Sequence, residues 1–203
     1  MIPLDALWKE YNRIIKPNGA IVLFSQSPFD KILGVSNLKF LRYEWIWEKT
    51  QATGHLNAKK MPMKAHENIL VFYKKLPVYN PQKTTGHPRK VSTAHHKRNS
   101  LKTEVYGKHE FTTYDSTERY PRDVLKFATD HQKSAIHSTQ KPESLLSYLI
   151  RTYTNEGALV LDNCFGSCST GVACINTNRD FIGIEKDEKY FRLGSERLFK
   201  EIK

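Results

Sequence analysis

The order of apolar and polar positions predicts an alternation of helices and strands in the first third of the chain. Apolar residues recur every three or four positions over 4–15, which predicts an amphipathic helix. The unbroken apolar run over 20–24 suits a parallel strand covered on both faces. Ser27-Pro28 suggests a helix N-cap followed by proline at the first helical position. The segments 43–48 and 68–73 predict two further strands.

The same alternation returns in the last third. Apolar positions over 145–153 predict a helix, and Leu159–Asp162 follows as a buried strand. A loop of small residues, Cys164–Gly171, leads into another helix. Phe181–Glu185 is the next expected strand, and a charged amphipathic helix closes the chain. Alternating strands and helices of this kind predict an α/β protein with a parallel sheet.

Residues 74–136 have a different character, because long apolar runs give way to Lys, Arg, His, Thr and Gly. A segment of this length exceeds an ordinary loop, so it is either an inserted subdomain or a flexible lid. The expected organisation is therefore a first core part over 1–73, an inserted basic region over 74–136, and a second core part over 137–203.

Charge and cysteine content narrow the classes of partner and compartment. The 203 residues carry 32 Lys and Arg against 21 Asp and Glu, a formal net charge of +11. This balance suits a polyanionic partner, although a merely solubilising surface is the alternative. Three cysteines without a signal peptide indicate a reducing compartment, so we expect a cytoplasmic protein. No apolar stretch reaches the roughly 20 residues of a membrane span.

The segment from Asp162 to Glu185 has the pattern of a nucleotide-binding strand–helix–strand unit. Ligands of open α/β sheets lie at the carboxyl edge, where the small-residue turn and Glu185 are expected. Glu185 stands about 20 residues after the turn, where a carboxylate can accept both ribose hydroxyls. The alternative is a generic α/β crossover with a small-residue helix start. Asp162 at the start of the turn suits a cationic ligand better than a pyrophosphate.

The cysteines do not predict a metal site. Cys164 and Cys168 are four residues apart and Cys174 is near, but no second ligand pair has the spacing of a zinc site. We therefore expect no bound metal.

Three segments carry a resemblance to a known family: His137–Pro142, Leu161–Ser167 and Ile182–Asp187. In order and spacing they resemble the DNA amino-methyltransferases, which methylate N6 of adenine or N4 of cytosine, in the permuted class whose catalytic half precedes the cofactor half. The helix, turn and strand over 4–24 are also similar to the family's segment after its catalytic motif. The resemblance implies a Rossmann-like methyltransferase sheet with an inserted basic target-recognition region, and S-adenosylmethionine as cofactor.

The resemblance also implies roles for individual residues. Asp162, Phe165 and Gly166 would line the methionine side of the cofactor, and Glu185 would hold its ribose. The segment at the start of the 145–153 helix would close over the methionine end. The complete set of implied cofactor contacts is Thr139, Gln140, Lys141, Asp162, Phe165, Gly166, Ser167 and Glu185.

Double-stranded DNA is the partner that the resemblance implies. The basic segments 51–66 and 74–136 fall where the family has its target-recognition region. His55 and Asn57 lie in a glycine-containing loop that could reach base edges. The basic residues expected to contact phosphates are Lys59, Lys60, Lys64, Arg89, Lys90, Lys97 and Arg98.

Departures from the family's pattern bear on activity. The family's catalytic tetrapeptide, an Asp, Asn or Ser followed by two prolines and an aromatic, is absent, because none of the nine prolines is adjacent to another. No catalytic residue is therefore predicted; the family's N-terminal strands are expected to be missing, and the chain alone to be inactive. An upstream complementing chain or a homo-oligomer is a possible partner. Cys168 replaces an expected glycine, and the alternatives are that it crowds the cofactor or that it demands an unfavourable backbone geometry. Ser138 replaces a usual proline.

Two other classes of function remain open from the residues alone. One is a non-catalytic nucleic-acid-binding remnant, for which DNA affinity without cofactor binding is expected. The other is a nicotinamide-dependent oxidoreductase that uses the same strand–helix–strand unit.

Overall fold

The computed structural model describes residues 2–94, 113–129 and 140–202. The chain forms two compact units, one made of residues 1–80 and 122–203 and the other of residues 81–121. The smaller unit lies inside the region 74–136 that the sequence suggests is an insertion. The described residues from 122 onward belong to the larger unit, and the role of 74–136 as an inserted region stays a prediction.

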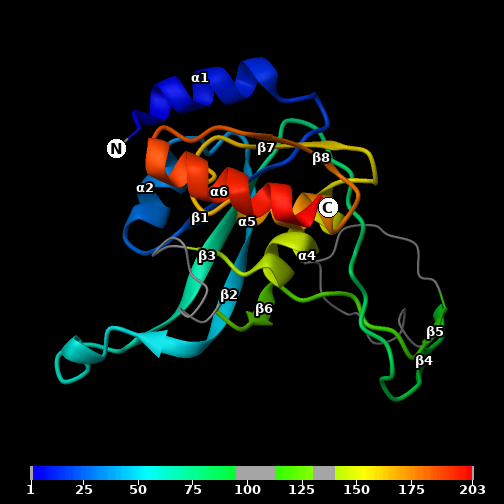
Figure 1. The fold of residues 1–203 in the computed structure, drawn as a ribbon. Helices are drawn as coiled ribbons and strands as arrows, with labels where there is room; N and C mark the ends of the chain where they lie inside the picture. The colour runs from blue at the N-terminus through cyan, green and yellow to red at the C-terminus, as the bar shows by residue number, and fades with distance from the viewer. Residues whose placement is uncertain (1, 95–112, 130–139, 203) are drawn as a thin grey trace. The chain divides into compact units, whose positions relative to one another are not determined.

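Helices and strands alternate in the first and last parts of the chain, and four described strands, β3 to β6, follow one another between them (Figure 1). The helices of the described residues are α1 (Leu4–Ile14), α2 (Phe29–Val35), the single 3-10 turn η1 (His55–Asn57), α4 (Glu143–Tyr153), α5 (Ser169–Ile175) and α6 (Glu188–Glu201). The strands are β1 (Ile21–Ser25), β2 (Leu41–Thr53), β3 (Lys64–Phe72), β4 (Lys90–Ser92), β5 (Tyr114–Ser116), β6 (Val124–Phe127), β7 (Leu159–Asp162) and β8 (Asp180–Gly183). None of the described helices combines the length and apolarity needed to cross a membrane.

The main sheet has the strand order β1-β3-β2-β6. The apolar run over 20–24 is covered on both faces, as predicted: Val22 and Phe24 pack towards α4, while Ile21 and Leu23 pack towards α1 and α2. Its predicted parallel pairing is wrong, because β1 runs antiparallel to β3, as does β2. Among the described strands of this sheet, only β6 is parallel to its neighbour. An unbroken apolar run indicates that both faces of a strand are buried, but it does not indicate whether the strand runs parallel or antiparallel to its neighbour.

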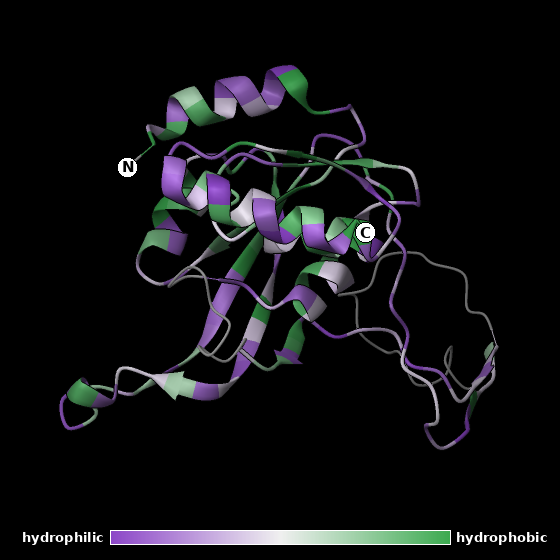
Figure 2. Ribbon diagram, viewed as in Figure 1, coloured by the Kyte–Doolittle hydropathy of each residue, from purple (hydrophilic) through white to green (hydrophobic). Residues whose placement is uncertain are grey.

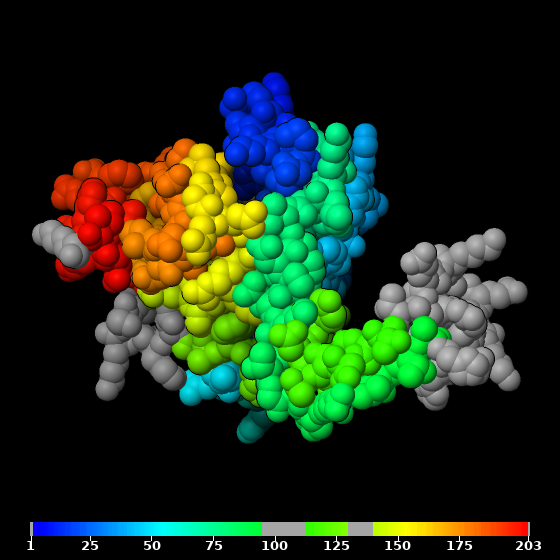
Figure 3. Space-filling model, turned by 90° about the vertical axis from the view of Figure 1, so that its right-hand side faces the viewer, coloured from blue at the N-terminus to red at the C-terminus, as the bar shows by residue number. Residues whose placement is uncertain are grey.

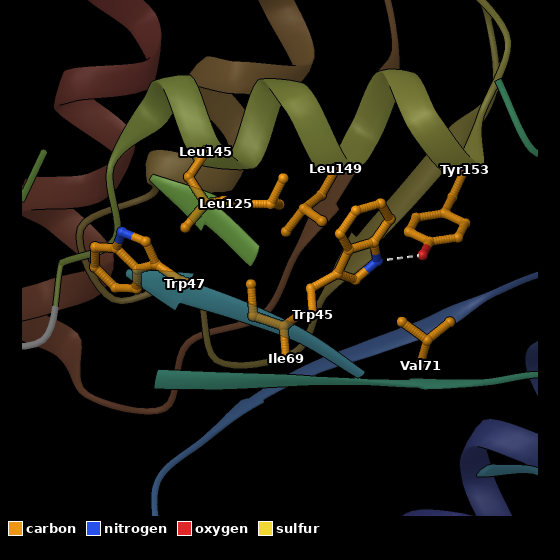
Figure 4. Close-up of a cluster of buried hydrophobic side chains, with 8 residues drawn as sticks. All are labelled: Trp45, Trp47, Ile69, Val71, Leu125, Leu145, Leu149 and Tyr153. Atoms are coloured by element: carbon orange, nitrogen blue, oxygen red, sulfur yellow. Dashed lines mark hydrogen bonds between the residues drawn. The ribbon is translucent and has the colours of Figure 1, made fainter. Parts of the chain in front are cut away.

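Helix α4 covers one face of this sheet. Its residues Leu145, Leu149 and Tyr153 point onto β2 and β3, where Figure 4 shows them against two tryptophans and two aliphatic side chains. The indole N–H of Trp45 donates to the Tyr153 hydroxyl at 2.6 Å, so this polar group is satisfied inside the apolar cluster. Apolar spacing alone predicts this helix, and packing fixes its position.

Strands β7 and β8 form a separate, parallel pair, in agreement with the prediction for this part of the chain. On one face, Val160 and Phe181 pack against a cluster that includes Leu146 of α4 and Ala173 of α5. Phe24 of β1 packs against the same cluster, so β1 and β7 share one helical layer. Among the described strands, β1 and β7 are not hydrogen-bonded to each other.

The start of α2 differs from the prediction. Its N-cap is Pro28, without a side-chain capping bond, so the assignment of Ser27 as N-cap is wrong. The first-turn donors are satisfied in another way: the N–H of Asp30 donates to the Gln26 carbonyl at 3.1 Å, and the N–H of Lys31 to the Asp30 carboxylate at 2.9 Å.

A buried ion cluster lies between the sheet and the start of α4. The Glu67 carboxylate accepts from Lys49 at 2.6 Å and lies 3.4 Å from the Lys141 ammonium, and the side chains of Glu67 and Lys49 are each only 8% exposed. Burial acts to raise the pKa of Glu67. The hydrogen bond from Lys49 and the charges of both lysines outweigh it, so the pKa lies below its usual range.

We predict that Glu67→Gln destabilises the protein by about 3 kcal/mol, because it leaves buried ammonium groups without a counter-charge. The matched control is Glu48→Gln, whose exposed pair with Lys126 spans 3.0 Å and should contribute less than about 1 kcal/mol. Urea unfolding measures both. A carboxylate whose pKa is lower in the folded than in the unfolded protein stabilises the fold at pH values above the unfolded pKa. The destabilisation caused by Glu67→Gln should therefore shrink as the pH falls through the pKa of Glu67 in the folded protein. Equal, small effects of both substitutions would contradict the assignment.

Candidate cofactor-binding site

The turn after β7 is held together by Asp162. One oxygen of its carboxylate accepts from the backbone N–H of Cys164 at 3.1 Å, and the other accepts from the Thr170 hydroxyl at 2.7 Å. These bonds join the end of the strand to both sides of the turn and to the first turn of α5. Asp162 therefore fixes the small-residue loop that the sequence singles out.

Glu185 lies two residues beyond β8 and binds backbone on both sides. Its carboxylate accepts from the N–H groups of Gly166 at 2.9 Å, Lys186 at 2.8 Å and Asp187 at 2.9 Å. The bonds from Asp187, Gly166 and Lys186 outweigh desolvation and lower the pKa of Glu185 below its usual range. The predicted pairing of the Gly166 turn with Glu185 is thus present in the structure.

The edge formed by these two loops is negatively charged. Within the described part of the chain, neither Asp162 nor Glu185 takes part in an ion pair. Burial raises the pKa of the Cys164 thiol between them, and the negative charges of Asp162 and Glu185 raise it further. Two uncompensated carboxylates suit a ligand that carries a positive charge and hydroxyl donors.

The residue before α5 has the strained geometry expected from the sequence. Cys168 has φ of 59°, the left-handed region that favours glycine, which costs about 1–2 kcal/mol. Its side chain is buried, and a Cβ added to Gly171 would come within 2.7 Å of its sulfur. The thiol therefore lies in the packing around α5.

Two predicted cofactor residues lie in packed surroundings. Phe165 is buried, with its ring centroid 5.8 Å from that of Phe191 on α6. Ser167 is also buried, and its hydroxyl lies 3.2 Å from that of Ser169. Contact of these side chains with a cofactor stays a prediction, and their burial favours a supporting role.

Arg197 of α6 is a residue that the sequence patterns did not identify. Its guanidinium donates to the Ser167 carbonyl at 2.8 Å and to the Ser169 hydroxyl at 3.0 Å, and it forms an ion pair with Glu143. It thereby joins the turn to the start of α4. No local signal distinguishes it from the other basic residues of a charged helix, because its partners lie 28 to 54 positions away.

The segment before α4 is only partly described. Thr139 lies outside the described residues, and Gln140 is half-buried. The Lys141 ammonium lies by Glu67 of β3 and 5.5 Å from the ring centroid of Phe24. The side chain of Lys141 is thus directed to the main sheet, and its contact with a cofactor stays a prediction.

Helix α1 also reaches the turn. The hydroxyl of Tyr11 donates to the Asn163 side chain at 2.9 Å, and Figure 3 shows the blue N-terminal segment adjoining a yellow part of the C-terminal third. Burial, followed by the charges of Cys164 and Asp162, raises the pKa of Tyr11 to about 12. This bond ties the N-terminal helix to the end of β7.

The predicted DNA-contacting residues occupy both units. Lys59, Lys60 and Lys64 are exposed in and beside the loop that joins β2 to β3. Arg89 forms two bonds to Asp115, of 2.8 and 2.6 Å, so its charge is partly compensated. Lys90 is exposed on β4. The predictions for Lys97 and Arg98 fall outside the described residues. In the part of the chain that is described, no cluster of three His, Cys, Asp or Glu residues could hold a metal ion.

Comparison with known proteins gives the family. Residues 4–196 match the family model described as DNA methylase, of the N6/N4 methyltransferase type. The chain is 29% identical over 202 residues to the Type II methyltransferase M.HpaI of Haemophilus parainfluenzae, over 96% of this chain and 58% of that protein. It is 40% identical over 79 residues to the DNA adenine methyltransferase YhdJ of Escherichia coli K12, over 39% of this chain and 26% of that protein.

A solved structure supports the same assignment. The crystal structure of an M1.HpyAVI–SAM complex matches with a TM-score of 0.66 at 26% identity, over 98% of this chain and 83% of that one. The chain therefore belongs to the N6/N4 DNA methylase family, as its motifs predict. It spans little more than half the length of M.HpaI.

The site makes a prediction about thiol reactivity. Cys164 is exposed, whereas Cys168 and Cys174 are buried with pKa values raised to about 11 and about 12. At neutral pH, iodoacetamide should modify Cys164 alone, and more slowly than free cysteine, because its raised pKa lowers the thiolate fraction. The rate should increase with pH up to that pKa. Peptide mass mapping measures the labelling, and earlier modification of either buried thiol would contradict the described turn.

Proposed function

We propose that the chain is the cofactor-binding and DNA-recognition part of an S-adenosylmethionine-dependent DNA methyltransferase. The observation that carries this proposal is the Glu185 carboxylate, fixed by the Gly166 N–H at the carboxyl edge of a parallel strand pair. In the proposed complex, Glu185 accepts the ribose hydroxyls and Asp162 faces the methionine end. Bound cofactor supplies an electrophilic methyl group on a sulfonium, and the two carboxylates orient that cation.

The charge at the turn argues against a nicotinamide cofactor. A dinucleotide has a pyrophosphate, which binds most favourably where backbone N–H groups face no competing anion. Here the Asp162 carboxylate already accepts from Cys164 and Thr170 at the start of α5. An anionic ligand would meet this carboxylate at close range, whereas a sulfonium would be attracted to it.

Glu185→Ala should weaken S-adenosylmethionine binding by about tenfold or more, since it removes a charged acceptor of two ribose hydroxyls. The matched control is Glu188→Ala on α6, whose exposed carboxylate lies 3.3 Å from Arg192 and should leave affinity unchanged. Calorimetric titration of both variants, with thermal unfolding to verify that each is folded, measures the effect. Equal affinities for wild type and Glu185→Ala would contradict the ribose assignment.

We propose double-stranded DNA as the substrate and N6 of adenine as the methylated atom, with N4 of cytosine as the alternative. The similarity to the adenine methyltransferase YhdJ supports adenine. The net charge of +11 and the exposed lysines beside η1 support a polyanionic substrate. Nucleoside analysis of methylated DNA distinguishes the two products.

We further propose that another polypeptide segment completes the catalytic site. Leu159, Leu161, Ile182 and Ile184 alternate along one face of β7–β8, and each is exposed, between 38% and 54%. Parallel strands are normally covered on both faces, so this apolar face is suited to a partner. The greater length of M.HpaI favours a segment carrying the Asp-Pro-Pro-Tyr-type tetrapeptide over a second copy of this chain.

The purified chain alone should therefore transfer no tritiated methyl group to DNA above background, while still binding the cofactor. The physical reason is that nothing in the 203 residues matches the tetrapeptide that would accept the hydrogens of the target amino group. Adding the portion of M.HpaI that lies outside its alignment with this chain should restore transfer. Robust turnover by the chain alone would contradict the proposal, and a stable dimer in light scattering would favour a second copy on the exposed face.

A further inference from the structure

The hairpin end formed by β2 and β3 extends beyond the rest of the main sheet. β1 pairs with residues 68–72 of β3, and β6 pairs with residues 46–49 of β2. Beyond these positions, as far as the described residues go, the two strands pair only with each other, and every residue from Thr50 to His66 is exposed. Figure 1 shows this segment, the hairpin end, as a cyan arm that ends in η1. None of its side chains is buried in the core.

The hairpin end carries positive charge without compensation from its own residues. Lys59, Lys60 and Lys64 lie within it, and Thr50 to His66 contains no Asp or Glu. Among the described residues, none of the three lysines takes part in an ion pair. Such a surface is complementary to a phosphate backbone.

The tip of this basic hairpin is apolar. Leu56 is 87% exposed, more than any other large hydrophobic residue among those described, and Met61 and Met63 are exposed beside it. Figure 2 shows green, hydrophobic positions among purple, hydrophilic ones at the end of the arm. Because water surrounds Leu56 on nearly all sides, its apolar surface is available to a partner.

The backbone holds this tip in a defined conformation. Gly54 has φ of 91°, which starts the reversal of the chain. The Asn57 carbonyl then accepts from the N–H of Lys60 at 2.8 Å and of Met61 at 3.0 Å. Leu56 is thus presented on an ordered turn, with lysines three, four and eight positions after it.

We propose that Leu56 is a wedge that enters the base stack of duplex DNA, while Lys59, Lys60 and Lys64 contact phosphates on either side. This inference rests on the proposed DNA substrate. It adds a residue that separates the stacked bases of that DNA. Apolar side chains inserted between base steps open the stack, and a base must leave the stack before its amino group can be methylated. The hairpin end combines both requirements, since its charge binds the backbone and Leu56 fills the opened step.

The test compares two duplexes of equal length, one fully paired and one with a single mismatch, titrated against the full chain by fluorescence anisotropy. A mismatch lowers the cost of unstacking, so wild type should bind the mismatched duplex about tenfold more tightly. Leu56→Ala should bring the two affinities within about twofold while retaining binding to the paired duplex. The matched control is Leu38→Ala, another exposed leucine outside the hairpin end, which should behave as wild type.

The lysines should act differently. The double substitution Lys59→Ala and Lys60→Ala should weaken binding to both duplexes by the same factor and reduce the slope of log affinity against log salt by about two. All variants change exposed positions, and thermal unfolding verifies that each is folded.

The outcomes separate this inference from the proposed function. Absence of DNA binding by wild type would overturn the proposed substrate and the wedge together. DNA binding without a preference for the mismatch, or with a preference that Leu56→Ala retains, would overturn the wedge alone. Binding to phosphatidylserine vesicles that exceeds DNA binding and is lost in Leu56→Ala would assign the tip to a membrane surface and likewise overturn it.

Discussion

The carboxylate of Glu185 accepts three backbone N–H groups, and in doing so it joins the loop after β7 to the loop after β8. Those loops cannot move independently while the bonds hold. Asp162 performs a similar task on the other side of the turn, through Cys164 and Thr170. A folded turn of small residues thus lies between two fixed carboxylates. The proposed recognition of ribose and sulfonium depends on this arrangement being formed before a ligand arrives.

Further contacts of the site connect this arrangement to other elements of the larger unit. Arg197 links the turn to Glu143 at the start of α4, and Tyr11 links it to α1. Helix α4 in turn packs on the tryptophans of the main sheet. Packing of the buried Cys168 side chain against α5 and α6 compensates for the strain in its backbone. The hairpin end lies outside all of these contacts, which suits a segment whose side chains are available to a nucleic acid.

The sequence predicts the parts of the fold that depend on local pattern. The α1 and α4 helices, the β7–β8 pair and the opposition of Gly166 to Glu185 follow from apolar spacing and from strand ends. The antiparallel direction of β1 does not, since both directions need the same apolar residues. The role of Arg197 could not be predicted either, because its partners are distant in sequence. The burial of Phe165 could not be predicted, because its place in a turn of small residues gives no sign of the helix that covers it. The sequence pattern also does not predict the length of the hairpin end, since its exposed residues show no alternation of apolar and polar positions.

The most direct test of the proposed cofactor site is an NMR titration of the isotope-labelled chain with S-adenosylmethionine. When Glu185 accepts ribose hydroxyls, its bonds to backbone weaken or lengthen, so the amide resonances of Gly166, Lys186 and Asp187 should shift together with a single saturating dependence on cofactor concentration. Saturable shifts confined to residues away from these three, or no shifts at millimolar cofactor, would contradict the account.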